Sequence, residues 1–83
     1  MSTLAVEIDD RVADVSVSDD ALEVRLRDGR RVSAPLSWFP RLAAASPEDR
    51  SVWELSGAGY GVHWPKIDED LSVAGLLRTA GAA

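Results

Sequence analysis

The sequence predicts an α+β domain, in which an antiparallel sheet of about five strands carries two short helices on one face, in the order βββ–α–ββ–α. Three observations predict this fold. Apolar and polar residues alternate through three segments between residues 13 and 36, which is typical of strands with one buried face. Helix-start signals then follow at Ser37 and Ser46. A further alternating stretch ends at Pro65, and Ser72 opens a last helical segment.

The first three strands are predicted at 13–17, 22–26 and 32–36. A two-residue loop of Asp28 and Gly29 would place the apolar side chains of the second and third strands on opposite faces, which a one-sided sheet does not tolerate. A three-residue loop of 27–29 instead pairs Val24 with Val32. It also gives Gly29 a left-handed backbone conformation, in which glycine has no steric penalty.

Two consecutive helical pieces are predicted after the third strand. Ser37 is suited to cap the first, at about 37–45, and Ser46 the second, at about 47–50. Strands at 52–55 and 60–64 follow. Ser72 is expected to cap a final helix of about 72–79, with Leu71 and Leu76 as a hydrophobic staple around the cap.

The chain of 83 residues has room for one hydrophobic core, so we expect a single domain over 1–83. Residues 1–11 are expected to form either a loose start or a short edge strand, and residues 80–83 a frayed tail. The core is predicted from the apolar face of each element: Val15, Val17, Leu22, Val24, Val32, Leu42, Trp53, Leu55, Val62, Leu76 and Leu77.

Composition excludes several classes of protein. No apolar run approaches the ~18 residues of a membrane span, and the N-terminus has no secretory signal, so a cytoplasmic protein without a membrane partner is expected. The absence of cysteine excludes disulfides, thiolate zinc sites and cysteine catalysis. A single histidine excludes a multi-histidine metal cluster within the chain. The sequence therefore predicts neither a cofactor nor an enzymatic activity.

His63 is the only candidate general base, and no serine lies in a Gly-x-Ser-x-Gly turn. The glycine-rich run 57–61 matches neither the P-loop nor the dinucleotide fingerprint, and it is better explained as a hairpin. His63 with Asp68, Glu69 and Asp70 could hold a divalent ion. The favoured interpretation is that these acids lead into the last helix, whose dipole stabilises them.

Two aromatic segments, 38–40 and 63–65, are the most distinctive parts of the chain. Trp38, Trp53 and Trp64 either pack together under the helices, or one of them lies exposed beside His63 and anchors a partner. The second interpretation defines a candidate interface, whose residues are Trp38, Phe39, His63, Trp64, Asp68, Glu69 and Asp70.

The net charge of −5 disfavours a general nucleic-acid binder. A local basic patch nevertheless remains, formed by Arg25, Arg27, Arg30 and Arg31. In the preferred register Arg25 stands opposite Arg31, and we expect Glu23 and Asp14 to balance them. Weak or no direct nucleic-acid binding is therefore expected.

One further pattern runs through residues 12–78. It comprises Arg31-Val-Ser-Ala-Pro-Leu-Ser-Trp-Phe-Pro-Arg-Leu42, Ser46-Pro-Glu48, Trp53-Glu-Leu55, Gly61-Val-His-Trp-Pro65, Asp68-Glu-Asp-Leu-Ser-Val73 and Gly75-Leu-Leu77. This pattern resembles the bacterial family named domain of unknown function 2442 (DUF2442). The resemblance implies a small α+β domain, and the family has no established catalytic residues to carry over.

The family resemblance also implies a partner. Members often stand beside another small protein in bacterial operons, an arrangement that looks like a toxin–antitoxin pair. Some relatives add a C-terminal helix-turn-helix, which the residues after 79 do not provide. We therefore expect a non-enzymatic protein-interaction module, the antitoxin-like partner of another protein encoded nearby. The alternatives are an accessory nucleic-acid-binding regulator that uses the Arg patch, and an enzyme or metal protein centred on His63.

Overall fold

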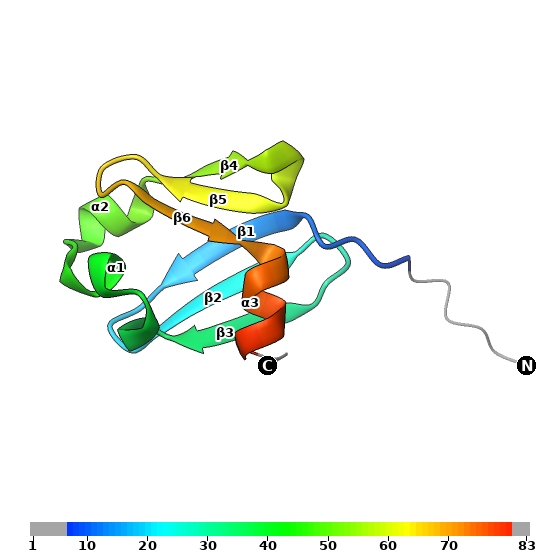
Figure 1. Ribbon diagram of the computed structural model, residues 1–83, viewed down its shortest axis with the longest axis horizontal. Coiled ribbons are helices and arrows are strands. Elements are labelled where there is room, and N and C mark those ends of the chain that lie inside the picture. The colour runs from blue at the N-terminus through cyan, green and yellow to red at the C-terminus, as the bar shows by residue number, and fades with distance from the viewer. Residues whose placement is uncertain (1–6, 81–83) are drawn as a thin grey trace, which may run out of the picture.

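The computed structural model describes residues 7–80 of the chain. Most of the predicted loose start, residues 1–6, lies outside the described residues. The same holds for residues 81–83 of the predicted frayed tail. The α+β class is confirmed (Figure 1). In chain order the elements are β1 (Val12–Val17), β2 (Ala21–Leu26), β3 (Arg31–Pro35), the 3₁₀ turn η1 (Leu36–Trp38), α1 (Pro40–Ala44), α2 (Pro47–Ser51), β4 (Glu54–Ser56), the 3₁₀ turn η2 (Gly57–Gly59), β5 (Gly61–Trp64), β6 (Glu69–Ser72) and α3 (Val73–Ala80).

The strands form two three-stranded antiparallel sheets rather than one sheet of about five strands. The first sheet has the order β1-β2-β3 and the second the order β4-β5-β6. Figure 1 shows the second sheet beyond the β1 side of the first, with α3 crossing in front of the first sheet. Among residues 7–80 no ladder joins the two sheets, and α2 contacts β1. None of the helices within residues 7–80 is long and apolar enough to cross a membrane.

The register of the β2–β3 hairpin is confirmed. Val24 lies opposite Val32, and Arg25 opposite Arg31. The loop closes through a hydrogen bond from the Gly29 amide to the Leu26 carbonyl, at 3.0 Å, and Gly29 has a φ of 98°. The three-residue loop therefore follows from the need to keep both apolar sets on one face.

Replacing Gly29 by Ala is expected to lower the free energy of unfolding by roughly 1 kcal/mol, since a Cβ is disfavoured in left-handed space. Apart from the glycine itself and its two neighbours in the chain, no heavy atom of residues 7–80 lies within 4 Å of the position of that Cβ, so the loss comes from the backbone and not from a clash. Urea denaturation measures it. Gly29→Asn should lose less, because asparagine tolerates this conformation. Unchanged stability of Gly29→Ala would contradict the assigned turn.

The start of β1 departs from the predicted alternation. The β1–β2 register shifts between Val12 and Asp14, so that Ala13 is left as the extra residue of a bulge. Val12 is buried in its place and Ala13 is exposed. A bulge changes which face a side chain occupies, and a strict period of two does not reveal it.

Two of the three predicted helix caps are confirmed. The Ser46 hydroxyl accepts the Asp49 amide at 3.1 Å, and the Ser72 hydroxyl accepts the Gly75 amide at 3.0 Å. The prediction for Ser37 is wrong: Ser37 lies within η1, and α1 begins at Pro40 without a side-chain cap. The residues before the last helix form β6, which pairs with β5. Sequence patterns did not reveal this strand, because β6 contains two acids and no β-branched residue. Its conformation depends on pairing with β5.

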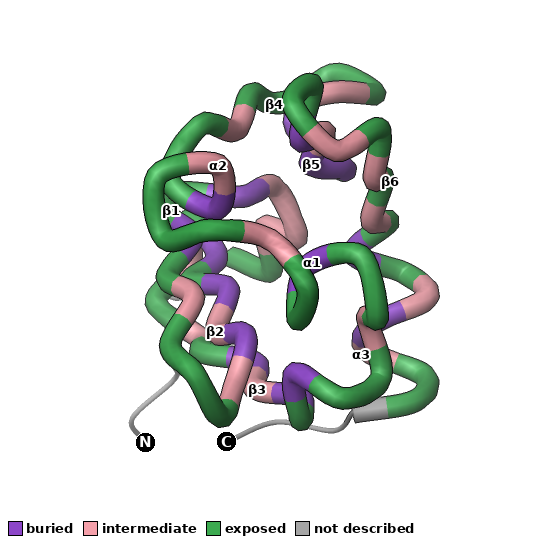
Figure 2. Tube along the Cα trace, turned by 90° about the vertical axis from the view of Figure 1, so that its left-hand side faces the viewer, coloured by how far each residue is buried: buried purple, intermediate pink, exposed green. Residues whose placement is uncertain are grey.

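The core fills the space that the two sheets and the helices enclose, and Figure 2 shows its buried residues on β2, β3, β5 and α1. Seven predicted core residues are buried: Val15, Leu22, Val24, Val32, Leu42, Val62 and Leu76. Val17, Trp53 and Leu77 are half-buried. The prediction for Leu55 is wrong, because β4 is an edge strand and leaves this side chain 43% exposed.

Candidate functional site

The predicted aromatic interface does not form as a unit. Trp64 is 0% exposed, and its indole N–H donates to the carbonyl of Arg50 at 3.0 Å. The assignment of Trp64 to an interface is therefore wrong, because its position in β5 places it on the same inner face as Val62. Trp38 is 50% exposed in η1, whereas Phe39 packs partly against the core.

His63 lies on the outer face of the second sheet, with Glu54 and Asp70 opposite it on the two neighbouring strands. Its Nδ1 is 2.8 Å from a carboxylate oxygen of Asp70, and the histidine side chain is 27% exposed. Within residues 7–80 no group of three or more His, Cys, Asp or Glu side chains is placed to hold a metal ion. The pair is thus a cross-strand contact on a solvent-facing surface.

Asp68 and Glu69 belong to the β5–β6 hairpin rather than to the entry of the last helix. Asp68 has a φ of 52°, which aspartate tolerates better than most residues. Its carbonyl accepts a hydrogen bond from the guanidinium of Arg41 at 2.6 Å. Glu69 lies opposite Trp64 in the ladder. The structure therefore gives these two acids a place in a turn and a strand.

The basic patch is only partly assembled. Arg25 and Arg31 line a hollow of about 150 Å³ on the open face of the first sheet, together with Asp14 and Glu23. The predicted carboxylates are thus close by. No ion pair within 4.0 Å joins them to either arginine in the described part of the chain. Like charges therefore meet across the ladder, an arrangement that is mildly unfavourable.

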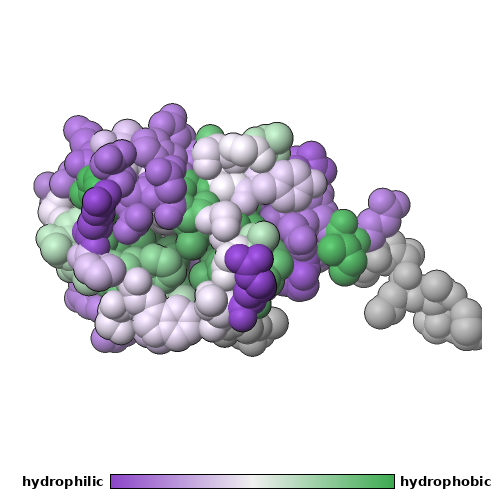
Figure 3. Space-filling view, viewed as in Figure 1, coloured by the Kyte–Doolittle hydropathy of each residue, from purple (hydrophilic) through white to green (hydrophobic). Residues whose placement is uncertain are grey.

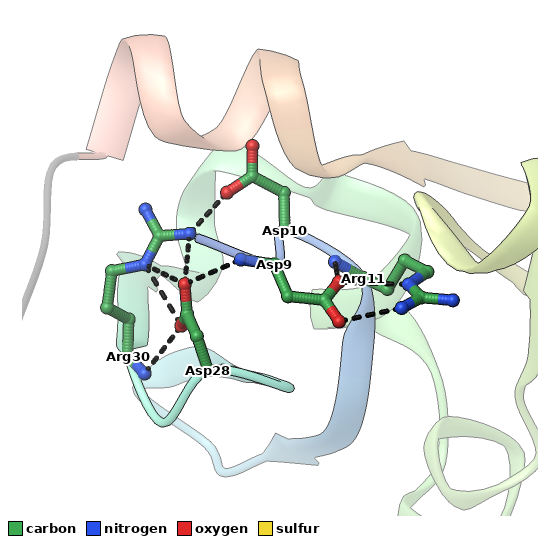
Figure 4. Close-up of polar contacts among 5 residues, drawn as sticks. All are labelled: Asp9, Asp10, Arg11, Asp28 and Arg30. Carbon is green, nitrogen blue, oxygen red and sulfur yellow. Dashed lines mark hydrogen bonds and ion pairs between the residues drawn. The ribbon is translucent and has the colours of Figure 1, made fainter. Parts of the chain in front are cut away.

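Arg30 turns away from this patch into an ion-pair network (Figure 4). Its guanidinium contacts the carboxylates of Asp28 and Asp10. Asp28 also accepts the backbone amide of Asp9 at 3.0 Å, and its side chain is 1% exposed. The network ties the segment before β1 to the β2–β3 loop.

Arg30 and Arg11 each lower the pKa of the aspartate carboxyl group that they contact. The hydrogen bonds of Arg30 hold the pKa of Asp28 well below its ordinary value of 3.8. Hydrogen bonds from Arg11 lower the pKa of Asp9 to about 2. Because both pKa values are lower in the folded chain, the network stabilises the fold fully above pH 3.8. Its contribution decreases as the pH falls below 3.8, until about pH 2 for Asp9 and to still lower pH for Asp28.

We therefore expect the free energy of unfolding to decrease between about pH 4 and pH 2, as urea denaturation at each pH would measure. Asp28→Asn should lower stability at pH 7 and flatten this dependence, since the amide does not titrate. Asp20→Asn is the control, because Asp20 is exposed and its side chain makes none of the hydrogen bonds found among residues 7–80. Equal pH profiles for both variants would contradict the assigned role of Asp28.

A second hollow, of about 180 Å³, lies between the outer edge of β1 and the segment formed by α2 and Trp53. We call it the seam; it is lined by Val15, Val17, Pro47, Arg50, Ser51 and Trp53. Val52 lies between α2 and Trp53, and Leu55 follows two residues after Trp53; they are 41% and 43% exposed. Figure 3 shows pale and hydrophobic atoms over β4, next to hydrophilic atoms over α2.

Sequence patterns did not reveal the seam. It arises where two segments about thirty positions apart meet without forming a ladder, and neither segment has a local signal for that meeting. The only hint was a half-apolar run, Val52 to Leu55, which the alternation assigned to an ordinary strand.

Comparison with known proteins gives the following matches. A family model described as "Protein of unknown function (DUF2442)" matches residues 12–82. The chain is also similar to a solved structure of a protein of unknown function from Rhodospirillum rubrum ATCC 11170. The two chains are 31% identical, with a TM-score of 0.69, and the match covers 88% of this chain and 90% of the other. No curated protein matches.

Proposed function

Because this chain belongs to the DUF2442 family, whose description names no activity, we propose from its surface that it is a non-enzymatic protein-interaction module. Its partner is another protein encoded nearby, and the chain is the antitoxin-like half of the pair. The exposed aliphatic side chains beside the seam are the observation that carries this proposal.

Single exposed apolar residues are common on protein surfaces and need no explanation. Val52 and Leu55 differ because they flank the half-buried Trp53, which lines a hollow. Aromatic and aliphatic side chains around a pocket, with polar residues at the rim, are typical of the centre of a protein interface. This surface therefore supports a binding role better than the scattered aromatic residues do.

The test is co-purification of the tagged full chain with the product of the neighbouring gene, both expressed from the native operon. The double variant Val52→Asp, Leu55→Asp should recover the neighbour at least about tenfold less well, since each buried aliphatic side chain contributes on the order of 1.5–3 kcal/mol. Tyr60→Asp is the matched control, because Tyr60 is an exposed aromatic residue outside the seam.

Circular dichroism establishes that each variant is folded. Trp38→Ser tests the rival aromatic surface and should leave recovery unchanged. Loss of the neighbour with Trp38→Ser, and not with the double variant, would move the interface to η1 and overturn the assignment. Failure to recover the neighbour with the unmodified chain would overturn the proposed function itself.

An accessory nucleic-acid-binding regulator is the second candidate, and one observation favours it: Arg25 and Arg31 lack an ion pair within residues 7–80. Asp14 and Glu23 line the same hollow, and their negative charges would repel a phosphate group. We therefore expect binding to duplex DNA of only ~10⁻⁴ M or weaker near physiological salt. A titration with its own promoter at several salt concentrations tests this. Submicromolar binding lost on Arg25→Ala with Arg31→Ala would favour the regulator.

A further inference from the structure

The seam contains a charged side chain that is almost fully buried. Arg50 lines the seam, and its side chain is only 10% exposed. Every other lining residue in the described part of the chain is uncharged, so the guanidinium determines the charge of this hollow. Its ion pair is with Asp19, at 3.1 Å. A buried cation is unfavourable unless it is paired and hydrogen-bonded, so the quality of this counter-ion matters.

Asp19 is a weak counter-ion for Arg50. Its side chain is 93% exposed in the β1–β2 turn, and water screens an ion pair of this kind. The guanidinium of Arg50 donates from Nε to the carbonyl of Leu42, from Nη2 to the carbonyl of Ala43 and from Nη1 to Asp19. Nη1 and Nη2 each carry a second hydrogen, which these bonds do not use. The guanidinium is therefore able to bind another anion, beside Asp19 or in its place.

The rest of the seam suits a flat apolar group. The half-buried Trp53 lines it together with Val15, Val17 and Pro47. An aromatic ring stacks favourably on an indole ring and packs well against aliphatic side chains. The hollow measures about 180 Å³, and a cavity of roughly 150 Å³ is enough to hold a benzene ring. The seam therefore has room for one aromatic ring with a small substituent.

The hollow on the first sheet is less suited to an anion. Arg25 and Arg31 line it, but Asp14 and Glu23 line it as well, and both arginines are exposed to water. Among residues 7–80 no carboxylate lines the seam. The net charge of −5 opposes anion binding anywhere on the chain, but salt screens charges that lie more than about 8–10 Å away. A guanidinium at contact distance therefore has the larger effect.

We propose that the seam is a binding site for a small aromatic carboxylate. The ring of the ligand lies against Trp53, and its carboxylate accepts N–H groups of Arg50 in competition with Asp19. Hydrogen bonds between a guanidinium and a carboxylate are among the stronger ones in proteins. A neutral aromatic molecule would leave the charge of Arg50 as it is, and acetate would leave the apolar walls uncovered. The site goes beyond the proposed interaction function and does not depend on it.

The test is an NMR titration of the full ¹⁵N-labelled chain with benzoate, at pH 7 and constant ionic strength. Benzoate should shift the amide signal of Val17 and the indole N–H signal of Trp53, with a Kd on the order of 1 mM. Benzamide, which has the same shape without the charge, and acetate, which lacks the ring, should each bind at least about tenfold more weakly. Equal binding of benzoate and benzamide would overturn the proposal, as would shifts centred on Arg25 and Arg31.

Asp19→Asn removes the competing carboxylate and should strengthen benzoate binding by about twofold to fivefold. Asp20→Asn is the matched control, since it makes the same charge change one position along, and Asp20 forms no ion pair among residues 7–80. Trp53→Leu should weaken binding at least about tenfold, whereas Trp38→Leu should leave it unchanged. Equal effects of Asp19→Asn and Asp20→Asn would show that Arg50 does not hold the carboxylate.

Circular dichroism establishes that each variant is folded. A short peptide that ends in Phe with a free carboxylate is the last probe. If it binds about tenfold more tightly than benzoate, the seam belongs to the end of a polypeptide chain, and the small-molecule site is rejected. A benzoate Kd weaker than about 10 mM also rejects the site. Recovery of the neighbouring protein that still depends on Val52 and Leu55 would then leave the proposed function standing.

Discussion

Replacing Trp64 by Ala is expected to lower the free energy of unfolding by about 3–5 kcal/mol. The side chain is completely buried in the core, so its removal leaves a large cavity. Its indole N–H also satisfies the carbonyl of Arg50, which would be left without that donor. A domain of this size has a total stability of only about 5–15 kcal/mol, so the variant is expected to populate the unfolded state.

Because Trp64→Ala is at risk of not folding, Trp64→Phe is the second variant. It keeps most of the buried surface and removes the N–H, so a loss of about 1–3 kcal/mol is expected. Trp38→Ala is the surface control and should change stability by no more than about 0.5 kcal/mol. Urea denaturation followed by circular dichroism measures all three. A folded Trp64→Ala protein as stable as Trp38→Ala would show that Trp64 is not a core residue.

Replacing Arg50 by Ala has the second largest expected effect, a loss of about 2–3 kcal/mol. The guanidinium donates to the carbonyls of Leu42 and Ala43, at 2.9 and 3.1 Å, near the C-terminal end of α1. A cation is favourable at that end of a helix, and these carbonyls lie where solvent has limited access. The contact between Arg50 and the exposed Asp19 adds little, because water screens it.

Arg50→Lys should recover part of the lost stability, since an ammonium group reaches fewer acceptors than the guanidinium fork. Arg78→Ala is the matched control: Arg78 is exposed on α3 and should change stability by no more than about 0.5 kcal/mol. Thermal unfolding provides an independent measurement. If Arg50→Ala and Arg78→Ala unfold alike, the bonds from Arg50 to α1 contribute nothing to the fold.

The β2–β3 hairpin was predictable because two independent constraints agree on it. The apolar alternation fixes the faces of Leu22 and Val24, and Gly29 is the residue that the resulting loop requires. β6 was not predictable, because its residues have little intrinsic strand preference and depend on β5 for their conformation. Hydrophobic periodicity and strand propensity are properties of a local segment, whereas β6 forms because β5 pairs with it.

The candidate site was less predictable than the fold. Trp64 looked like an anchor because of its distinctive sequence context, yet burial depends on which face of β5 covers the core. The seam depends on how far α2 lies from β1, which no spacing in the sequence encodes.

The separation of the two sheets has a consequence for cooperativity. Among residues 7–80 no strand pairing joins the first sheet to the second, so their coupling depends on side chains. Three bonds connect the α1–α2 segment to the two halves of the molecule: Trp64 to Arg50, Arg41 to the β5–β6 turn, and Arg50 to Asp19 in the β1–β2 turn. We therefore expect the unfolding of one sheet to be coupled to that of the other through the short helices α1 and α2. Amide protection in β5 depends on residues that belong to neither sheet.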